Sequence, residues 1–124
     1  MLVVPSVGRA AMLELIVKAG LTLELFTNDV QPGSSDTTGT YTTPSGGGYA
    51  SKKLAGKGWV VKNGVAIAPE QVFTFTGPIK PNLVFGYFVR LGNILMWAER
   101  SEQPFPVNLK GDTFIVVPTF TLAE

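Results

Sequence analysis

A chain of 124 residues fits one compact domain, and ten Lys and Arg residues against nine Asp and Glu residues leave a formal net charge of only +1. No global field therefore draws it to nucleic acid or an anionic membrane, and the absence of cysteine and histidine excludes disulfides, thiolate metal sites and the commonest general base. Only 15% of the residues are charged and the mean hydropathy is +0.26, so we expect apolar surface to be buried in an oligomer or a larger assembly.

One short helix is expected over residues 6–19. Apolar residues recur there at helical spacing, Ser6 stands where an N-cap would, and Gly20 follows as a stop signal. Charged residues and Pro5 interrupt the apolar run, which predicts neither a signal peptide nor a membrane span, and we expect folding in the cytoplasm. The helix is expected either to pack on a sheet or to form an arm that reaches a neighbouring subunit.

A long loop separates the first two expected strands. Residues 21–26 alternate leucine with polar residues, which is the period of a half-buried strand, and residues 49–54 form a second, shorter candidate. Between them, residues 29–48 are rich in Gly, Ser, Thr and Pro and almost lack aliphatic side chains. Such a loop is either a contact-making excursion or a flexible connector, and its side chains favour neither.

Two more strands are joined by a tight turn. Residues 58–68 place Asn63-Gly64 between two apolar runs, which predicts a hairpin with a type I′ turn. Residues 72–76 alternate phenylalanine and threonine or valine as a further strand, and GPIKPN at 77–82 then breaks the chain.

The next hairpin, residues 86–100, is apolar on both faces. A type II′ turn at Gly92-Asn93 would pair Arg90 with Leu95, Phe88 with Trp97 and Gly86 with Glu99. The opposite face then carries seven other apolar residues: Phe85, Tyr87, Val89, Leu91, Ile94, Met96 and Ala98. One face can fill a core, and the other must be covered by the helix, by the long loop or by another subunit.

The last expected strand covers residues 113–122. Thr113, Thr119 and Thr121 share one face with two aliphatic residues, Ile115 and Val117, and Pro118 places its segment at an edge or a bulge. Seven or eight short strands after one helix predict a mainly β single domain, residues 1–124. Its expected architecture is an antiparallel β-sandwich or a jelly-roll-like fold over residues 21–124 with one short N-terminal helix.

Catalytic motifs are weak throughout the chain. Glu99 and Glu102 could serve a glycosidase, but solvated charges near a strand end explain them better. The glycines of residues 44–53 lack the order of a phosphate loop.

Four lysines surround Trp59 and could form a small basic patch for single-stranded nucleic acid, although stems covering apolar surface explain them equally well: Lys52, Lys53, Lys57 and Lys62. We expect no enzyme, cofactor, metal, nucleic acid, membrane or small-molecule substrate.

Seven fragments carry a resemblance that spans nearly the whole chain. They are VPSVG (4–8), LFTNDVQP (25–32), GYASKKL (48–54), GYFV (86–89), LMWAE (95–99), GDTF (111–114) and PTFTL (118–122). In these fragments the chain is similar to a family of small virion structural proteins of tailed bacteriophages. It departs from the family's usual pattern in a shorter loop after Trp59.

The resemblance implies a structural role in the virion and brings no catalytic motif. The implied role is that of a capsid decoration, or cement, protein that clamps neighbouring subunits of the major capsid protein, with a tail or baseplate component as the alternative. Because excess apolar surface on a small domain is best buried by symmetric contact, we expect a closed homo-oligomer, a trimer at capsid three-fold positions.

The candidate assembly contacts are large aromatic side chains and one strand valine: Tyr41, Tyr49, Trp59, Phe88, Trp97 and Val117. A carbohydrate-binding β module is the second alternative, and it would need an exposed planar aromatic platform with polar groups beside it. The supply of Leu, Val and Ile on both hairpin faces favours assembly, which needs broad apolar contact.

Overall fold

A computed structural model of the chain describes residues 1–54 and 58–122. The described chain is mainly β and antiparallel, with one α-helix near its start, as the sequence predicts. Its elements are α1 (Ser6–Val17), β1 (Thr22–Phe26), a 3₁₀ turn (Thr38–Thr40), β2 (Lys52–Lys53), β3 (Val60–Lys62), β4 (Val65–Ile67), β5 (Gln71–Thr74), β6 (Leu83–Leu91), β7 (Ile94–Pro106), β8 (Thr113–Val116) and β9 (Thr119–Thr121).

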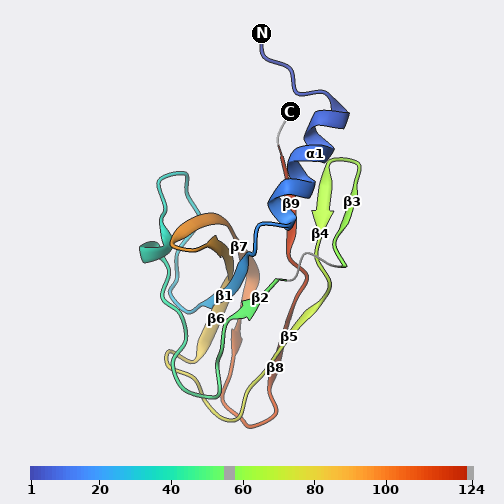
Figure 1. Ribbon diagram of the computed structural model, residues 1–124. Coiled ribbons are helices and arrows are strands. Elements are labelled where there is room, and N and C mark those ends of the chain that lie inside the picture. Colours follow the sequence, from blue (N-terminus) through green and yellow to red (C-terminus); the bar gives the residue numbers. More distant parts are fainter. Residues whose placement is uncertain (55–57, 123–124) are drawn as a thin grey trace.

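Two β layers make up the body of the molecule (Figure 1). The first is a four-stranded sheet in the order β2-β1-β6-β7, dominated by the long strands β6 and β7. The second, here called the ribbon, consists of β3, β4, β5, β8 and β9: β4 and β5 follow each other and pair with β9 and β8. A hydrogen bond from Ala68 N to Pro118 O (2.9 Å) links the two paired stretches, and the single last strand expected over residues 113–122 is divided at Pro118 into β8 and β9.

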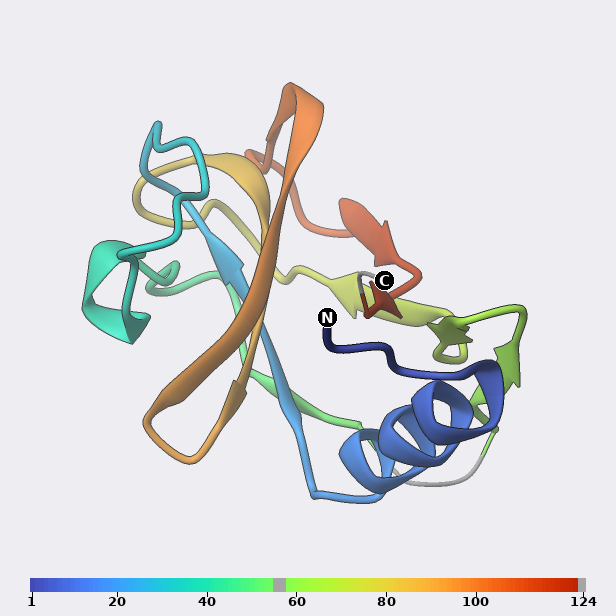
Figure 2. The same cartoon turned by 90° about the horizontal axis from the view of Figure 1, so that it is seen from above.

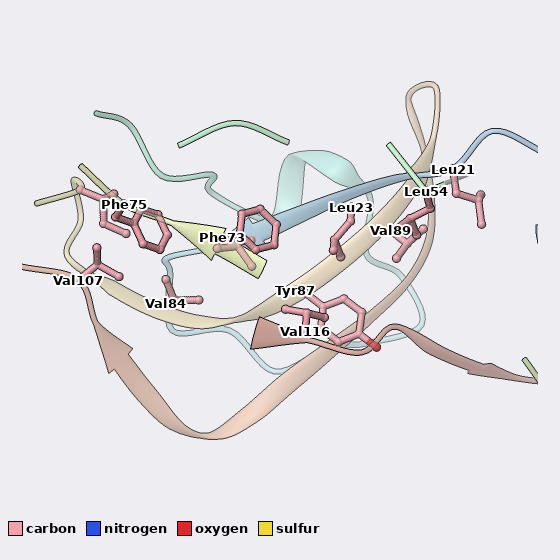
Figure 3. Close-up of a cluster of buried hydrophobic side chains, with 12 residues drawn as sticks. Leu21, Leu23, Leu54, Phe73, Phe75, Val84, Tyr87, Val89, Val107 and Val116 are labelled. Carbon is pink, nitrogen blue, oxygen red and sulfur yellow. The ribbon is translucent and has the colours of Figure 1, made fainter. Parts of the chain in front are cut away.

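The core lies between these two layers (Figure 3). The first sheet contributes Leu23, Leu25 and Val89, and the ribbon contributes Phe73 and Val116. Strand alternation explains this arrangement, because every second residue of β1, β6 and β8 faces the same side. The result is a sandwich-like fold, in which each layer hides the apolar face of the other.

Helix α1 packs on the inner side of the ribbon beside β3 and β4 (Figure 2), which agrees with the simpler of the two sequence expectations. Leu13 and Val17 are buried there against Ala66. The prediction that Ser6 caps the helix is wrong, because Pro5 O already accepts a bond from Arg9 N (2.9 Å) and Ser6 is the first helical residue.

Both predicted tight turns form. Asn63 and Gly64 have positive φ angles of 54° and 76°, as a type I′ turn requires, and Gly92 has φ of 57° at the position where a type II′ turn needs glycine. Arg90 pairs with Leu95 as predicted. Turn chemistry therefore determined the register next to each turn.

The predicted register fails one step beyond the second turn. Val89 pairs with Trp97, Phe88 with Ala98, and Gly86 with Arg100, instead of Phe88 with Trp97 and Gly86 with Glu99. A β-bulge at Met96 inserts one extra residue into β7, and a shift of one residue exchanges the faces of all later side chains. Trp97 consequently joins the sandwich core, while Phe88 lies on the opposite face of the sheet.

The long loop covers that opposite face. Residues 28–43, here called the covering loop, lie on the side of the first sheet away from the ribbon (Figures 1 and 2). Tyr41 stacks on Phe88 with 5.1 Å between ring centroids and contacts Phe26 at 4.8 Å. All three rings are at most 6% exposed, so the loop forms a second small core.

Polar contacts hold the covering loop in place. The Asn28 side chain donates to Thr40 O and accepts from Thr42 N, both at 2.8 Å, and closes the loop at its base. Arg100 from β7 pairs with Asp29 (2.6 Å) and donates to Val30 O (3.1 Å). These contacts hold the loop against the sheet. Of the two interpretations that the sequence allowed, a contact-making excursion and a flexible connector, the structure therefore shows the first.

Tyr41→Ala should lower the free energy of unfolding by about 3–5 kcal/mol, because it removes a buried ring from the small core under the loop. Tyr41→Phe keeps the ring and loses only the hydroxyl bond to Asp36 (2.8 Å), so it should cost about 0.5–1.5 kcal/mol. Urea unfolding of both variants measures the difference. Equal, small losses in the two variants would contradict a packed cover.

Candidate assembly surfaces

Tyr41 and Phe88 are internal side chains of the folded chain. Their rings are 6% and 2% exposed, respectively, because Tyr41 of the covering loop stacks on Phe88 of the first sheet. The sequence suggested them as intermolecular contacts because the hairpin face had no visible cover. The structure supplies that cover from within the same chain.

Trp97 and Trp59 are half-buried and also pack inward. The Trp97 ring stacks on Phe120 with 4.6 Å between centroids, so it joins the first sheet to the end of the ribbon. The Trp97 Nε1 is buried without a hydrogen bond of good geometry. It faces the Tyr87 hydroxyl and slightly lowers the pKa of that tyrosine. Trp59 packs against both the sandwich core and the cluster under α1, which leaves its ring unsuited to stacking on a nucleobase. Lys57, which the sequence placed in a basic patch beside it, lies outside the described residues.

Tyr49 completes the edge of the first sheet. Strand β2 pairs only with Thr22 and Leu23, so the next outward N–H of β1, at Leu25, lacks a strand partner. The Tyr49 hydroxyl accepts a bond from Leu25 N (3.0 Å) and donates to the Glu24 carboxylate (2.6 Å). Arg90 then pairs with the same carboxylate at 3.1 Å. Tyr49 therefore acts as a substitute for the missing strand.

No aromatic ring of the chain is highly exposed. All thirteen Phe, Tyr and Trp residues belong to the described part, and each is buried or half-buried. Apolar side chains that are well exposed are all aliphatic. Any surface that meets a partner through apolar contact must therefore do so through Val, Ile, Leu and Met.

The ribbon presents such a surface on its outer side. Strand alternation turns Phe73, Phe114 and Val116 inward and leaves a set of outward residues here called the ribbon face. All of them are β-branched except one lysine: Val60, Lys62, Val65, Ile67, Val72, Thr74, Thr113, Ile115, Val117, Thr119 and Thr121.

The apolar members of the ribbon face lie next to one another. Val72 pairs with Ile115 across β5 and β8, and Val60 pairs with Ile67 across β3 and β4. Val60 and Ile115 are 57% and 55% exposed, and Val117, between β8 and β9, is 45% exposed. Val117 is thus the one sequence-predicted contact that lies on the surface. For the ribbon-face residues that the sequence analysis did not name, the available signal was the alternation of Thr, Ile and Val in residues 113–121.

Chemical groups for catalysis do not converge in the described part of the chain. A cavity of about 410 Å³ opens between α1 and the β3–β4 turn, and among the described residues that line it Arg9 alone is charged. Glu99 and Glu102 are both exposed on β7, the edge strand of the first sheet. Residues 1–54 and 58–122 contain no group of three acidic residues placed to hold a metal ion. Within the same ranges, no helix has the length and apolar character needed to cross a bilayer.

Comparisons of the chain with protein-family models, with curated proteins and with solved structures found no match. The resemblance to phage virion proteins therefore stays a prediction from the fragments of the sequence.

All three tyrosines ionise less readily than a free tyrosine. Burial raises the pKa of Tyr87 to about 12, with a smaller contribution from Glu99. Burial also raises the pKa of Tyr49 and of Tyr41, and their hydrogen bonds to Glu24 and Asp36 act in the same direction. The folded chain thus holds three phenolic protons that the unfolded chain loses near pH 10.

Stability should therefore be independent of the tyrosines below about pH 10 and should fall as pH rises toward about pH 12, because only the unfolded state releases these protons. Urea midpoints at about pH 9 and pH 11 measure the loss. The ultraviolet absorbance of tyrosinate should appear together with unfolding and not before it, a readout that lysine titration does not affect. Tyrosinate forming near pH 10 with unchanged circular dichroism would refute this assignment.

Proposed function

We propose that this chain is a structural protein of a tailed-bacteriophage virion, and more specifically a capsid decoration protein that binds the major capsid protein as a homo-oligomer. The proposal places it in the virion, with no catalytic activity. The family resemblance of the seven sequence fragments supports the phage assignment. The ribbon face is the single structural observation that carries the assembly role.

The ribbon face has the character of a binding surface for a folded protein. A contiguous set of apolar residues that spans strands on a small soluble domain is uncommon unless a partner covers it. Its β-branched side chains are stiff at χ1, so they lose little rotamer freedom when a partner is bound. With Lys62 as its only charged member, the face would bind through shape and apolar contact more than through charge.

The carbohydrate-binding alternative finds less support. A sugar site needs an exposed aromatic platform, and every aromatic ring of the chain is buried or half-buried in its own fold. A tail or baseplate component would use the same apolar surface, so the structure favours assembly over sugar binding without separating the two virion locations.

Ile115→Lys should weaken binding to particles by about tenfold or more, because it places a charge at the centre of the contact surface. Particles of the encoding phage that lack this protein are incubated with purified variants and sedimented. Leu109→Lys is the matched control, since Leu109 is 68% exposed but lies in the turn between β7 and β8, outside the ribbon face. Equal binding of both variants would contradict the ribbon face as the contact, and no binding of the wild type would contradict the proposed function.

The copy number in native particles should scale with the number of major-capsid subunits. Quantitative mass spectrometry of purified virions measures this ratio directly. A copy number equal to the number of subunits in one tail ring, and equal in phages with small and large shells, would contradict decoration. It would favour the tail alternative.

A further inference from the structure

Helix α1 is apolar on the side that faces solvent as well as on the side that is buried. At 100° per residue, Val7, Ala11 and Leu15 follow one another along the outer side, with Met12 beside them. Val7 is 80% exposed, Leu15 72% and Met12 46%. A surface helix normally turns polar residues toward solvent, so these four residues, here called the stripe, form an apolar surface that no other described part of the chain covers.

Residues 1–5 continue this apolar surface beyond the helix. They run as an extended segment away from the body of the molecule (Figure 1), and Met1, Leu2 and Val3 are 114%, 90% and 66% exposed. The segment and the stripe are therefore two exposed apolar features at the same end of the molecule.

We propose that the stripe and residues 1–5 form the interface between copies of this chain, with the α1 helices of neighbouring copies packed against each other around a symmetry axis. The inference gives the homo-oligomer of the proposed function its contact surface. It does not depend on the identity of the shell that the oligomer binds.

The size of the surface fits a stable self-contact. Six Met, Leu and Val side chains that are about half to fully exposed amount to an area of the same order as the roughly 800 Å² per partner of a standard interface. In a closed oligomer every copy buries the same surface, so one type of contact covers the whole of it.

Small residues at the centre of the stripe favour a helix as the occupant. Gly8 and Ala11 lie between Val7 and Leu15 on the outer side and allow two helix backbones to approach closely. Packing within the chain does not explain Gly8, because a Cβ built there would meet no atom nearer than 3.9 Å. Close approach by a second helix accounts for a glycine at the third position of α1, where a larger side chain would hold the two backbones apart.

The charges beside the stripe suit a second copy better than other partners. Glu14 and Lys18, which are exposed along one side of the stripe, carry opposite signs, so two identical surfaces meet without net repulsion. A helix that binds a lipid surface would instead carry a row of basic residues on its polar face, whereas α1 contains only Arg9, with Lys18 as its C-cap.

Leu15→Lys tests the interface with full-length protein. Light scattering of the wild type should give an integral multiple of 13.3 kDa, and Leu15→Lys should give 13.3 kDa with an unchanged circular dichroism spectrum, because the Leu15 side chain is 72% exposed in the single chain. Leu109→Lys should keep the mass of the wild type, because Leu109 is similarly exposed but belongs to the turn between β7 and β8, a segment that lies at the other end of the molecule from α1 (Figure 1). A monomeric wild type at about 100 μM, or an oligomeric Leu15→Lys, would overturn the proposal.

A single cysteine at Ala11 gives a second, independent readout. The chain has no cysteine, so Ala11→Cys can form a disulfide only between copies, and only where two Cβ atoms approach to about 3.5–4.5 Å. Mild oxidation should give covalent dimers of Ala11→Cys and none of Leu109→Cys; dimers of both, or of neither, would contradict stripe-to-stripe packing. Failure of the proposed function is distinct: an oligomer that forms these dimers but does not bind particles keeps the self-contact and refutes the shell role.

Discussion

The central sheet of this protein is apolar on both faces, and the rest of the fold follows from the need to cover each of them. Leu23 and Val89 point to one side, and Phe26 and Phe88 point to the other. A sheet with one wet face would need only the ribbon as its second layer. Here residues 28–43 also cover the other face, and Tyr41 makes their main apolar contact with it. Burial of each large ring contributes on the order of 1.5–3 kcal/mol toward the conformational entropy that is lost when a long loop is fixed.

Glycine makes this double burial geometrically possible at one point. Gly86 in β6 pairs with Phe26 in β1, and a Cβ there would clash with the Glu99 carbonyl oxygen of β7 and lie 2.8 Å from the Phe26 ring. Any other residue would push Phe26 away from the covering loop and open the small core. The fragment GYFV thus combines the glycine that admits one ring with Phe88, which stacks on another. LFTNDVQP and GYFV thus both contribute residues that keep the second face closed.

The sequence predicted those parts of the fold that depend on local chemistry. Asn63-Gly64 and Gly92 fixed their turns because few residues adopt positive φ, and the alternation in β1 and β8 fixed their faces. The bulge at Met96 could not be predicted, since Leu95, Met96, Trp97 and Ala98 are all apolar and no alternation marks which of them faces the core. The position of the covering loop could not be predicted either, because its Gly, Ser, Thr and Pro residues carry no pattern. Only Tyr41 and a few polar contacts hold it on the sheet.

The same reasoning explains why five of the six candidate contacts are buried or half-buried within the single chain. Large aromatic side chains are often the anchors of interfaces, which made Tyr41, Phe88 and the two tryptophans attractive from sequence alone. A domain of this size with two faces to cover uses its aromatic rings internally, and its outer surfaces are left with Val, Ile, Leu and Met. Val117, the one aliphatic candidate, is accordingly the one that lies on the surface.

Aliphatic surfaces on a nearly neutral domain have consequences for the proposed assembly. Contacts without buried charge are little screened by salt, and each single patch is modest in area. If one surface, the stripe, joins copies and another, the ribbon face, meets the shell, then every copy in an oligomer adds a linked contact with the same particle. Linked contacts multiply, since the second binding event occurs at a high effective concentration, so weak patches can give firm attachment. Two separate apolar surfaces on one small chain are therefore more useful to a lattice-binding protein than a single strong site would be.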